Sequence, residues 1–297
     1  MDSNKDTSTP AWWLRALGRV PLPVMYALAA ALAFLMRDVL RYRVSVARSN
    51  LTAALPELDA ATRERVLRRH YDSLAAVLFE LPRLASMDAD ELRTRMALPD
   101  MPAVRAQLAG GTPVLVLAAH QGNWEWLLQA LALGFGAPFL AAYKPPHSEA
   151  ADRLMLGLRG RFGTRMVPGK RLLREVLRRR GSAHAIGMVA DQVPTSSPGR
   201  VWLRFLGRDT AFFPGPAEIA RAGGYAVYFL ALRRLRRGYY ETRFEPLARA
   251  DEQLDVPTLI GRYAARVEAL VREHPEDWAW THRRWKLTPP DKAAATA

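Results

Sequence analysis

The sequence contains no cysteine, and this absence excludes disulfide bonds, cysteine-ligated zinc and thiol catalysis. The serine-nucleophile motif G-x-S-x-G and the phosphate-binding motif G-x-x-x-x-G-K-[ST] are missing as well. None of the six histidines forms a short helical pair of the H-E-x-x-H kind, so the sequence predicts no metal site. The common sequence motifs for a catalytic nucleophile, a nucleotide site or a zinc site therefore do not indicate what this chain does.

Acidic residues are outnumbered by basic ones, 29 to 43, which gives a formal net charge of +14. A chain of this charge attracts anions, whether nucleic acid, anionic lipid or an acidic carrier protein. Charge alone also fits a non-enzymatic protein that binds membranes or nucleic acid and does not depend on any one histidine. The 297 residues, of which 49% are hydrophobic, suffice for one large α/β domain with an appendage.

The N-terminal part contains an uncharged stretch, residues 20–36, close to the shortest length that crosses a bilayer. Pro21 and Pro23 at its head, and the lack of a small-residue cleavage site, argue against a cleaved signal peptide. We expect residues 1–45 to form a membrane anchor that spans the bilayer or lies in its surface, a buried core helix being the alternative. The arginines that follow place this flank on the cytoplasmic side: Arg37, Arg41, Arg43 and Arg48.

The rest of the chain alternates short apolar runs with helical patterns, which predicts an α/β sheet. We expect strands at residues 113–119, 138–143, 165–167, 183–190, 201–205, 226–232 and 239–244. We expect helices at residues 61–84, 124–133, 150–158, 170–180, 216–222 and 256–274, with Pro82 ending or kinking the first. Only the last residues, 291–297, have the composition of a disordered tail.

One histidine stands out by its position. His120 follows the apolar run 114–119, at the end of a predicted strand, where open α/β sheets place their ligand sites. Gly122 and Asn123 provide a tight turn and an N-cap, so that Glu125 lies in the first turn of a helix and can point back at His120. His147 has the same spacing to an acidic residue, but it follows two prolines in a loop, and we favour His120.

Such a dyad would act by general base catalysis without a covalent intermediate. An imidazole with an ordinary pKa near 6.5 accepts a proton from a hydroxyl at neutral pH, and a carboxylate fixes its tautomer. The hydroxyl would then attack an acyl thioester, for which no serine or cysteine nucleophile is needed.

The segment His120-Gln121-Gly122-Asn123-Trp124-Glu125 resembles the H-x-x-x-x-[D/E] block of the lysophospholipid acyltransferase superfamily, and specifically its lipid A late acyltransferase branch. The similarity extends over most of residues 37–286. It includes further blocks in the same order: Tyr143-Lys144-Pro145, residues 158–163, Ala190-Asp191-Gln192, residues 210–216 and residues 280–286.

The resemblance implies a fold like that of the glycerol-phosphate acyltransferases, an α/β mixed sheet flanked by helices, with a membrane-anchoring N-terminal helix before an acyltransferase domain at residues 46–290. It implies transfer of a fatty acyl chain to a hydroxyl of a lipid A precursor at the cytoplasmic face of the bacterial inner membrane. The donor would be an acyl carrier protein or coenzyme A thioester, with no further cofactor and no nucleic acid partner.

The same resemblance implies roles for individual residues. His120 would be the catalytic base and Glu125 its orienting partner. The residues expected to bind substrate are Asn123, Lys144, Arg161, Asp191, Gln192 and Gly215, with Lys144 and Arg161 directed at phosphate and Phe212, Phe213 and Gly215 shaping an acyl pocket.

Two questions stay open in the sequence. The same dyad would serve another lipid acceptor, such as a lysophospholipid, an ornithine lipid or a glycolipid. The tryptophans near the C-terminus form either an interfacial patch or a packed segment that closes the core: Trp278, Trp280 and Trp285.

Overall fold

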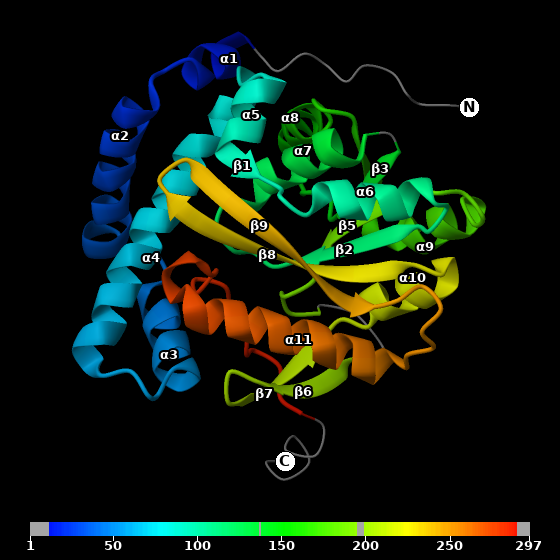
Figure 1. Ribbon diagram of the computed structural model, residues 1–297. Helices are drawn as coiled ribbons and strands as arrows, with labels where there is room; N and C mark the ends of the chain where they lie inside the picture. Colours follow the sequence, from blue (N-terminus) through cyan, green and yellow to red (C-terminus); the bar gives the residue numbers. More distant parts are fainter. Residues whose placement is uncertain (1–11, 137, 195–198, 290–297) are drawn as a thin grey trace.

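A central sheet of seven strands organises the computed structural model, which describes residues 12–136, 138–194 and 199–289 (Figure 1). The strand order is β1-β9-β8-β2-β5-β3-β4, and all neighbours are parallel except the long hairpin of β8 and β9. The bounds are β1 Met96–Ala97, β2 Val114–Ala118, β3 Phe139–Tyr143, β4 Thr164–Pro168, β5 Ala185–Val189, β8 Ala226–Arg236 and β9 Tyr239–Ala248. The predicted α/β class with a mixed sheet is confirmed.

Helices cover both faces of this sheet because its strands are apolar on both sides. Along β2 all residues are buried, with Leu115 and Leu117 in one core and Val116 and Ala118 in the other. The helices are α3 Val44–Ala54, α4 Ala60–Glu80, α5 Ala89–Arg95, α6 Met101–Ala109, α7 Trp124–Phe135, α8 Glu149–Arg159, α9 Gly169–Arg178, α10 Gly215–Gly223 and α11 Val256–Glu273. Helix α11 contributes to the first core and α7 to the second.

The predicted elements are found close to their expected bounds, but one predicted strand lies outside the central sheet. The predicted strand at residues 201–205 is β6, Val201–Phe205, but it pairs with β7, Arg208–Phe212, in a separate two-stranded sheet. Leu206 and Gly207 between them have φ values of 50° and 70°, which is the two-residue turn that closes a hairpin. The hairpin is thus determined locally, and it lies beside α11 (Figure 1).

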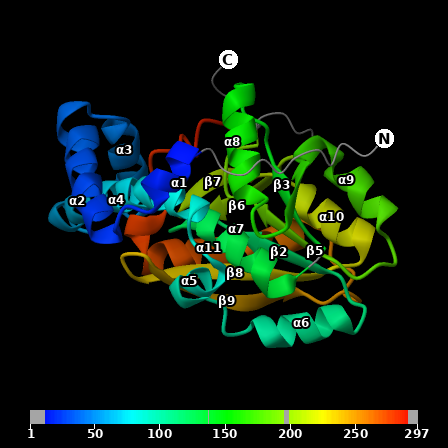
Figure 2. The ribbon, with the colours of Figure 1, turned by 90° about the horizontal axis from the view of Figure 1, so that it is seen from above.

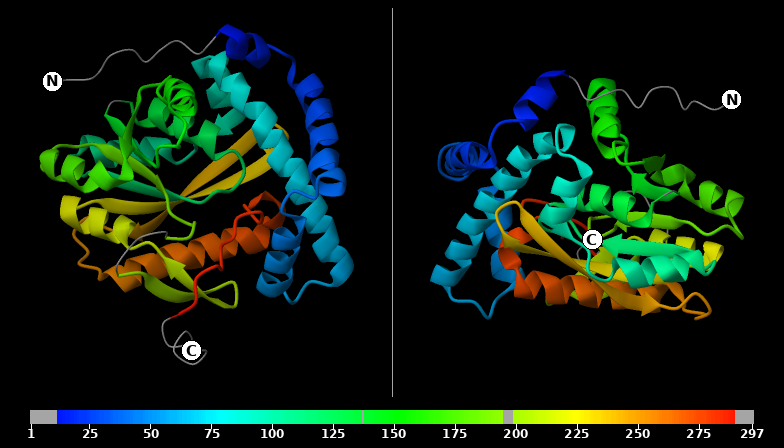
Figure 3. Two further views of the ribbon diagram at one scale, coloured as in Figure 1. Left: turned by 180° about the vertical axis from the view of Figure 1, so that it is seen from behind. Right: turned by 45° about the horizontal axis from the view of Figure 1, so that its top comes forward.

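The N-terminal segment forms α1, Trp12–Gly18, and α2, Leu22–Phe34, followed by a π-helical turn at Leu35–Val39. Helix α2 packs along α4, as Figures 2 and 3 show from two sides. It buries Met25, Ala29 and Ala33. Leu22–Val39 is the one described segment long and apolar enough to cross a membrane. The anchor and the domain division stay predictions, and the expected tail at residues 291–297 lies outside the described residues.

Candidate active site

The carboxyl ends of β2 and β5 bring together two side chains that are far apart in the sequence. His120 follows β2, and Asp191 follows β5, its parallel neighbour. The Nδ1 atom of His120 lies 2.6 Å from Oδ1 of Asp191, and the backbone N–H of His120 donates to Oδ2 at 3.1 Å. The indole Nε1–H of Trp278 also donates to this Oδ2, at 2.9 Å. The imidazole is therefore held by a carboxylate that is itself held in place.

The predicted pairing of His120 with Glu125 is wrong. Glu125 lies in the first turn of α7 as expected, but its carboxylate forms a bidentate ion pair with Arg159, the last residue of α8. Arg159 Nε donates to Oε2 at 2.9 Å and Nη2 to Oε1 at 2.5 Å. The physical reason is that Asp191 already occupies Nδ1 of His120, while α8 presents a guanidinium beside Glu125.

Asp191 is ionised in this environment. It is 2% exposed, and burial by itself would raise the pKa of its carboxyl group, but the charge and hydrogen bonds of His120 and the indole of Trp278 lower the pKa further than burial raises it. An anionic Asp191 keeps the imidazole proton on Nδ1 and leaves the lone pair on Nε2. His120 is thereby prepared to accept a proton.

His120 lines a cavity of about 320 Å³ between the sheet and α7. The polar side chains in its wall include His120, Glu125, Lys144, Arg159 and Gln192. The rest is mostly apolar and includes Val116, Ala118, Leu127, Leu128, Leu131, Ala141, Met166 and Gly187. An apolar space with a base and two cations in its wall suits a hydrocarbon chain that ends in a polar, reacting group.

This arrangement agrees with the comparison to known proteins. The profile of the bacterial lipid A biosynthesis acyltransferase family matches residues 7–287. The chain belongs to this family. It is therefore an acyltransferase, an enzyme that moves an acyl group to an acceptor of lipid A biosynthesis.

Relatives of this acyltransferase are distant but match along nearly their whole length. It is 23% identical to the lipid A biosynthesis palmitoleoyltransferase of Escherichia coli K12 over 293 residues, which is 94% of this chain and 93% of that protein. The same figures hold for the lipid A biosynthesis acyltransferase of Shigella flexneri. The lipid A biosynthesis acyltransferase of Haemophilus influenzae is 22% identical, over 91% of this chain and 84% of its own length.

Of the expected substrate-binding residues, Lys144 and Gln192 line the cavity of the acyltransferase, and Asp191 lies behind His120. Asn123 does not reach it. The Asn123 side chain is fully buried, with Oδ1 accepting from the backbone N–H of Trp126 at 2.9 Å as the N-cap of α7 and Nδ2 donating to Glu80 at 2.7 Å. The predicted N-cap is confirmed, whereas substrate contact by Asn123 stays a prediction that its burial away from the cavity wall does not favour.

The other expected ligands also lie away from this cavity. The guanidinium of Arg161 donates to the backbone carbonyls of Leu84 and Met87, so it is engaged by the segment after α4 instead of phosphate. Gly215 begins α10, and Phe212 is buried against the ring of Tyr263 at 6.4 Å. Gly215, Phe212 and Phe213 are not part of the cavity wall, because the hairpin that leads to α10 packs on the α11 side of the sheet.

The C-terminal tryptophans belong to the core. Trp278 and Trp280 are 2% and 0% exposed, and their rings make an edge contact at 4.7 Å. Of the two alternatives that the sequence left open, the packed segment is therefore correct for these two residues. Trp278 has a further role, because its indole is one of the donors that hold Asp191.

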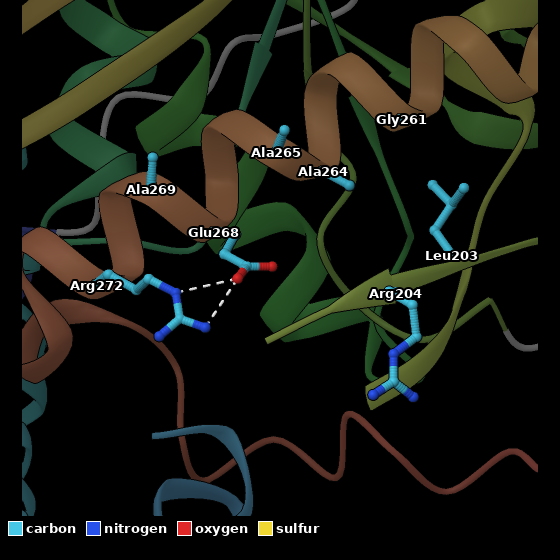
Figure 4. Close-up of a pocket in the computed structure, with 8 residues that line it drawn as sticks. All are labelled: Leu203, Arg204, Gly261, Ala264, Ala265, Glu268, Ala269 and Arg272. Atoms are coloured by element: carbon cyan, nitrogen blue, oxygen red, sulfur yellow. Dashed lines mark hydrogen bonds and ion pairs between the residues drawn. The ribbon is translucent and has the colours of Figure 1, made fainter. Parts of the chain in front are cut away.

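A second cavity, of about 420 Å³, lies between α11 and β6 (Figure 4). Its wall contains no histidine, and much of it is made of small residues such as Gly261, Ala264 and Ala265. Its one carboxylate, Glu268, is bound by Arg272 at 2.9 Å and by the backbone N–H of Leu206 at 2.7 Å. This cavity offers no free base, so the cavity at His120 is the better candidate for the active site.

Proposed function

We propose that the protein transfers a fatty acyl chain from a thioester of acyl carrier protein, or of coenzyme A, to a hydroxyl group of a lipid A precursor. The observation that carries this proposal is the position of His120, bound to an ionised Asp191 on one side and facing an apolar cavity on the other. Family membership supports the acceptor, and the basic surface suits either anionic donor.

In the proposed reaction His120 Nε2 removes the proton of the acceptor hydroxyl while its oxygen attacks the thioester carbonyl. The tetrahedral intermediate then expels the thiolate, which takes the proton from the imidazolium. Asp191 stabilises the imidazolium that forms between these two steps. Arg159 and Lys144, in the wall of the same cavity, supply positive charge for the anionic oxygen or for substrate phosphate.

The proposal is tested by transfer of a labelled acyl chain from acyl carrier protein to a lipid A precursor, with detergent-solubilised enzyme. We expect His120→Ala to lower kcat at least about a hundredfold. His147→Ala, which removes an exposed histidine outside the cavity, is the matched control and should keep wild-type activity. If the wild type transfers the chain only to a lysophospholipid, an ornithine lipid or a glycolipid, that lipid is the acceptor instead of a lipid A precursor. Activity that survives His120→Ala would refute the mechanism.

We further propose that the enzyme lies in the cytoplasmic surface of the bacterial inner membrane. Large apolar side chains are exposed along α1, α2 and the π-helical turn: Trp12, Trp13, Leu17, Val24, Leu28, Phe34, Leu35 and Val39. The opposite side of α2 packs on α4, whose exposed residues include Arg65, Arg68 and Arg69. A spanning α2 would draw these arginines toward the hydrocarbon, so an orientation parallel to the surface is favoured.

Replacing Leu28 and Phe34 together by glutamate is expected to reduce binding to vesicles of phosphatidylethanolamine and phosphatidylglycerol at least about tenfold. The reason is that burying each such side chain in lipid contributes roughly 1.5–3 kcal/mol. Co-sedimentation with vesicles measures the effect. Leu177→Glu, at an equally exposed leucine of α9, is the control, and equal losses in both variants would contradict the proposed orientation.

The apolar part of the cavity is expected to select the acyl chain length. Leu131 faces the cavity two turns along α7 from Trp124. In Leu131→Ala the preference in kcat/KM should shift toward donors with longer acyl chains, by about fourfold for each added methylene that becomes buried. A series of thioesters of increasing length measures this preference. Leu133→Ala, on the same helix but outside the cavity, should leave it unchanged, and an unchanged profile in Leu131→Ala would show that the chain binds elsewhere.

A further inference from the structure

Glu80, the last residue of α4, is a buried carboxylate that the proposed reaction does not use. It is 0% exposed and is not part of the cavity wall. Three side chains donate hydrogen bonds to it: Tyr26 Oη to Oε1 at 2.8 Å, Asn123 Nδ2 to Oε2 at 2.7 Å and Tyr240 Oη to Oε2 at 2.8 Å. Burying a carboxylate without hydrogen-bond donors lowers the stability of the folded state, so the position of Glu80 depends on these three partners.

One of the three partners belongs to the catalytic turn. Asn123 caps α7 and lies between His120 and Glu125 in the chain. The indole Nε1–H of Trp126, in the first turn of α7, donates to the backbone carbonyl of Glu80 at 3.1 Å. Glu80 therefore binds the start of α7 through both its side chain and its backbone, and it fixes the turn that follows His120.

Another partner belongs to the helix that we place at the membrane. Tyr26 lies on α2 beside the buried Met25, while its neighbours Val24 and Leu28 are exposed. Its hydroxyl reaches across to Glu80, so one carboxylate group is shared between α2 and the catalytic turn. A shift of α2 on α4 would remove a donor from Glu80 and disturb the carboxylate that holds Asn123.

We propose that Glu80 is a positioning residue that couples the binding of α2 to the lipid surface with the geometry of the turn that follows His120. Binding of α2 to a bilayer favours the arrangement in which Tyr26, Glu80 and Asn123 are joined, and turnover is fastest in that arrangement. The coupling rests on the proposed acyl transfer and on the proposed membrane orientation, and it adds a means by which the membrane activates the enzyme.

The test measures the ratio of kcat with and without empty vesicles of phosphatidylethanolamine and phosphatidylglycerol. A short-chain, water-soluble hydroxyacyl ester serves as acceptor, so that vesicles do not change its presentation. For the wild type we expect a ratio between about five and a hundred, the range that small displacements of a catalytic group produce. Tyr26→Phe, which removes only the hydroxyl, should bind vesicles like the wild type but bring the ratio close to one.

Two further variants separate positioning from general stability. Tyr71→Phe removes another hydroxyl of the same kind, which donates from α4 to the backbone carbonyl of Tyr42 at 2.5 Å, and it should keep the wild-type ratio. Glu80→Gln should reduce the ratio as Tyr26→Phe does, and the double variant should show no additional loss, because both act on one connection.

The outcomes distinguish this coupling from the reaction on which it rests. A wild-type ratio close to one despite vesicle binding, or a wild-type ratio in Tyr26→Phe, would refute the coupling while leaving acyl transfer intact. No transfer to any hydroxyl acceptor by the wild type, with or without vesicles, would refute the proposed function and the coupling with it.

Discussion

Asp191→Asn is expected to lower kcat by about four orders of magnitude, the scale seen when a catalytic histidine is left in the wrong tautomer. Oδ2 of Asp191 accepts from two N–H groups, the backbone of His120 and the indole of Trp278, so the amide oxygen of asparagine would take its place. The amide N–H₂ would then face Nδ1 of His120 and force that nitrogen to accept. The proton would move to Nε2, the nitrogen required as the base.

Steady-state kinetics with acyl carrier protein thioesters measure this loss, and the pH profile of kcat should change with it. Glu175→Gln is a suitable control, because Glu175 on α9 is a half-buried carboxylate that binds Arg178 and Arg179 at the end of that helix, away from the cavity. A kcat of Asp191→Asn within tenfold of the wild type, together with a large loss in His120→Ala, would mean that His120 acts without help from Asp191.

Local features of this site could be predicted from the sequence because they depend on neighbouring residues. The turn at Gly122, with a φ of 54°, and the N-cap at Asn123 follow from the preferences of glycine and asparagine. The position of His120 at the end of a buried strand follows from the apolar run before it. These predictions are confirmed.

The partner of His120 could not be predicted in this way. Asp191 lies 71 residues further along the chain, and it reaches His120 only because β5 is inserted between β2 and β3 in the sheet. Strand order depends on how the helices pack, which the periodicity of one segment does not reveal. The spacing of His120 and Glu125 is a local signal, and it predicts a contact that the longer-range packing replaces.

Arg161 is the predicted phosphate ligand, but Arg159 is the arginine that lines the cavity. Both lie in the block of residues 158–163 that resembles the family, but Arg159 is the last residue of α8 and Gly160 is its C-cap. Arg159 therefore keeps the direction that the helix gives it, toward Glu125, whereas Arg161 follows the turn to the carbonyls of Leu84 and Met87.

Arg159→Met is expected to lower the free energy of unfolding by about 2–3 kcal/mol. Removing one partner of a fully buried ion pair costs about 3–5 kcal/mol, and this value is reduced here because the Arg159 side chain is 22% exposed. The cost arises from Glu125, which is 7% exposed and would lose the bidentate partner that offsets its burial. Urea unfolding followed by tryptophan fluorescence measures it, and Arg93→Met, in the exposed pair with Asp90, should cost less than about 1 kcal/mol.

The double variant Glu125→Gln with Arg159→Met shows whether the ion pair contributes only to the free energy of unfolding or also to kcat. Because it removes both charges, most of the lost stability should return. If the ion pair only stabilises the fold, kcat of the double variant should return to the wild-type value as well. We expect kcat to stay low, because Arg159 and Glu125 belong to the wall of the cavity that contains His120, and a neutral pair there leaves the reacting oxygen without a nearby guanidinium. Recovery of both quantities would reduce the pair to a structural contact and leave His120 and Asp191 as the catalytic groups.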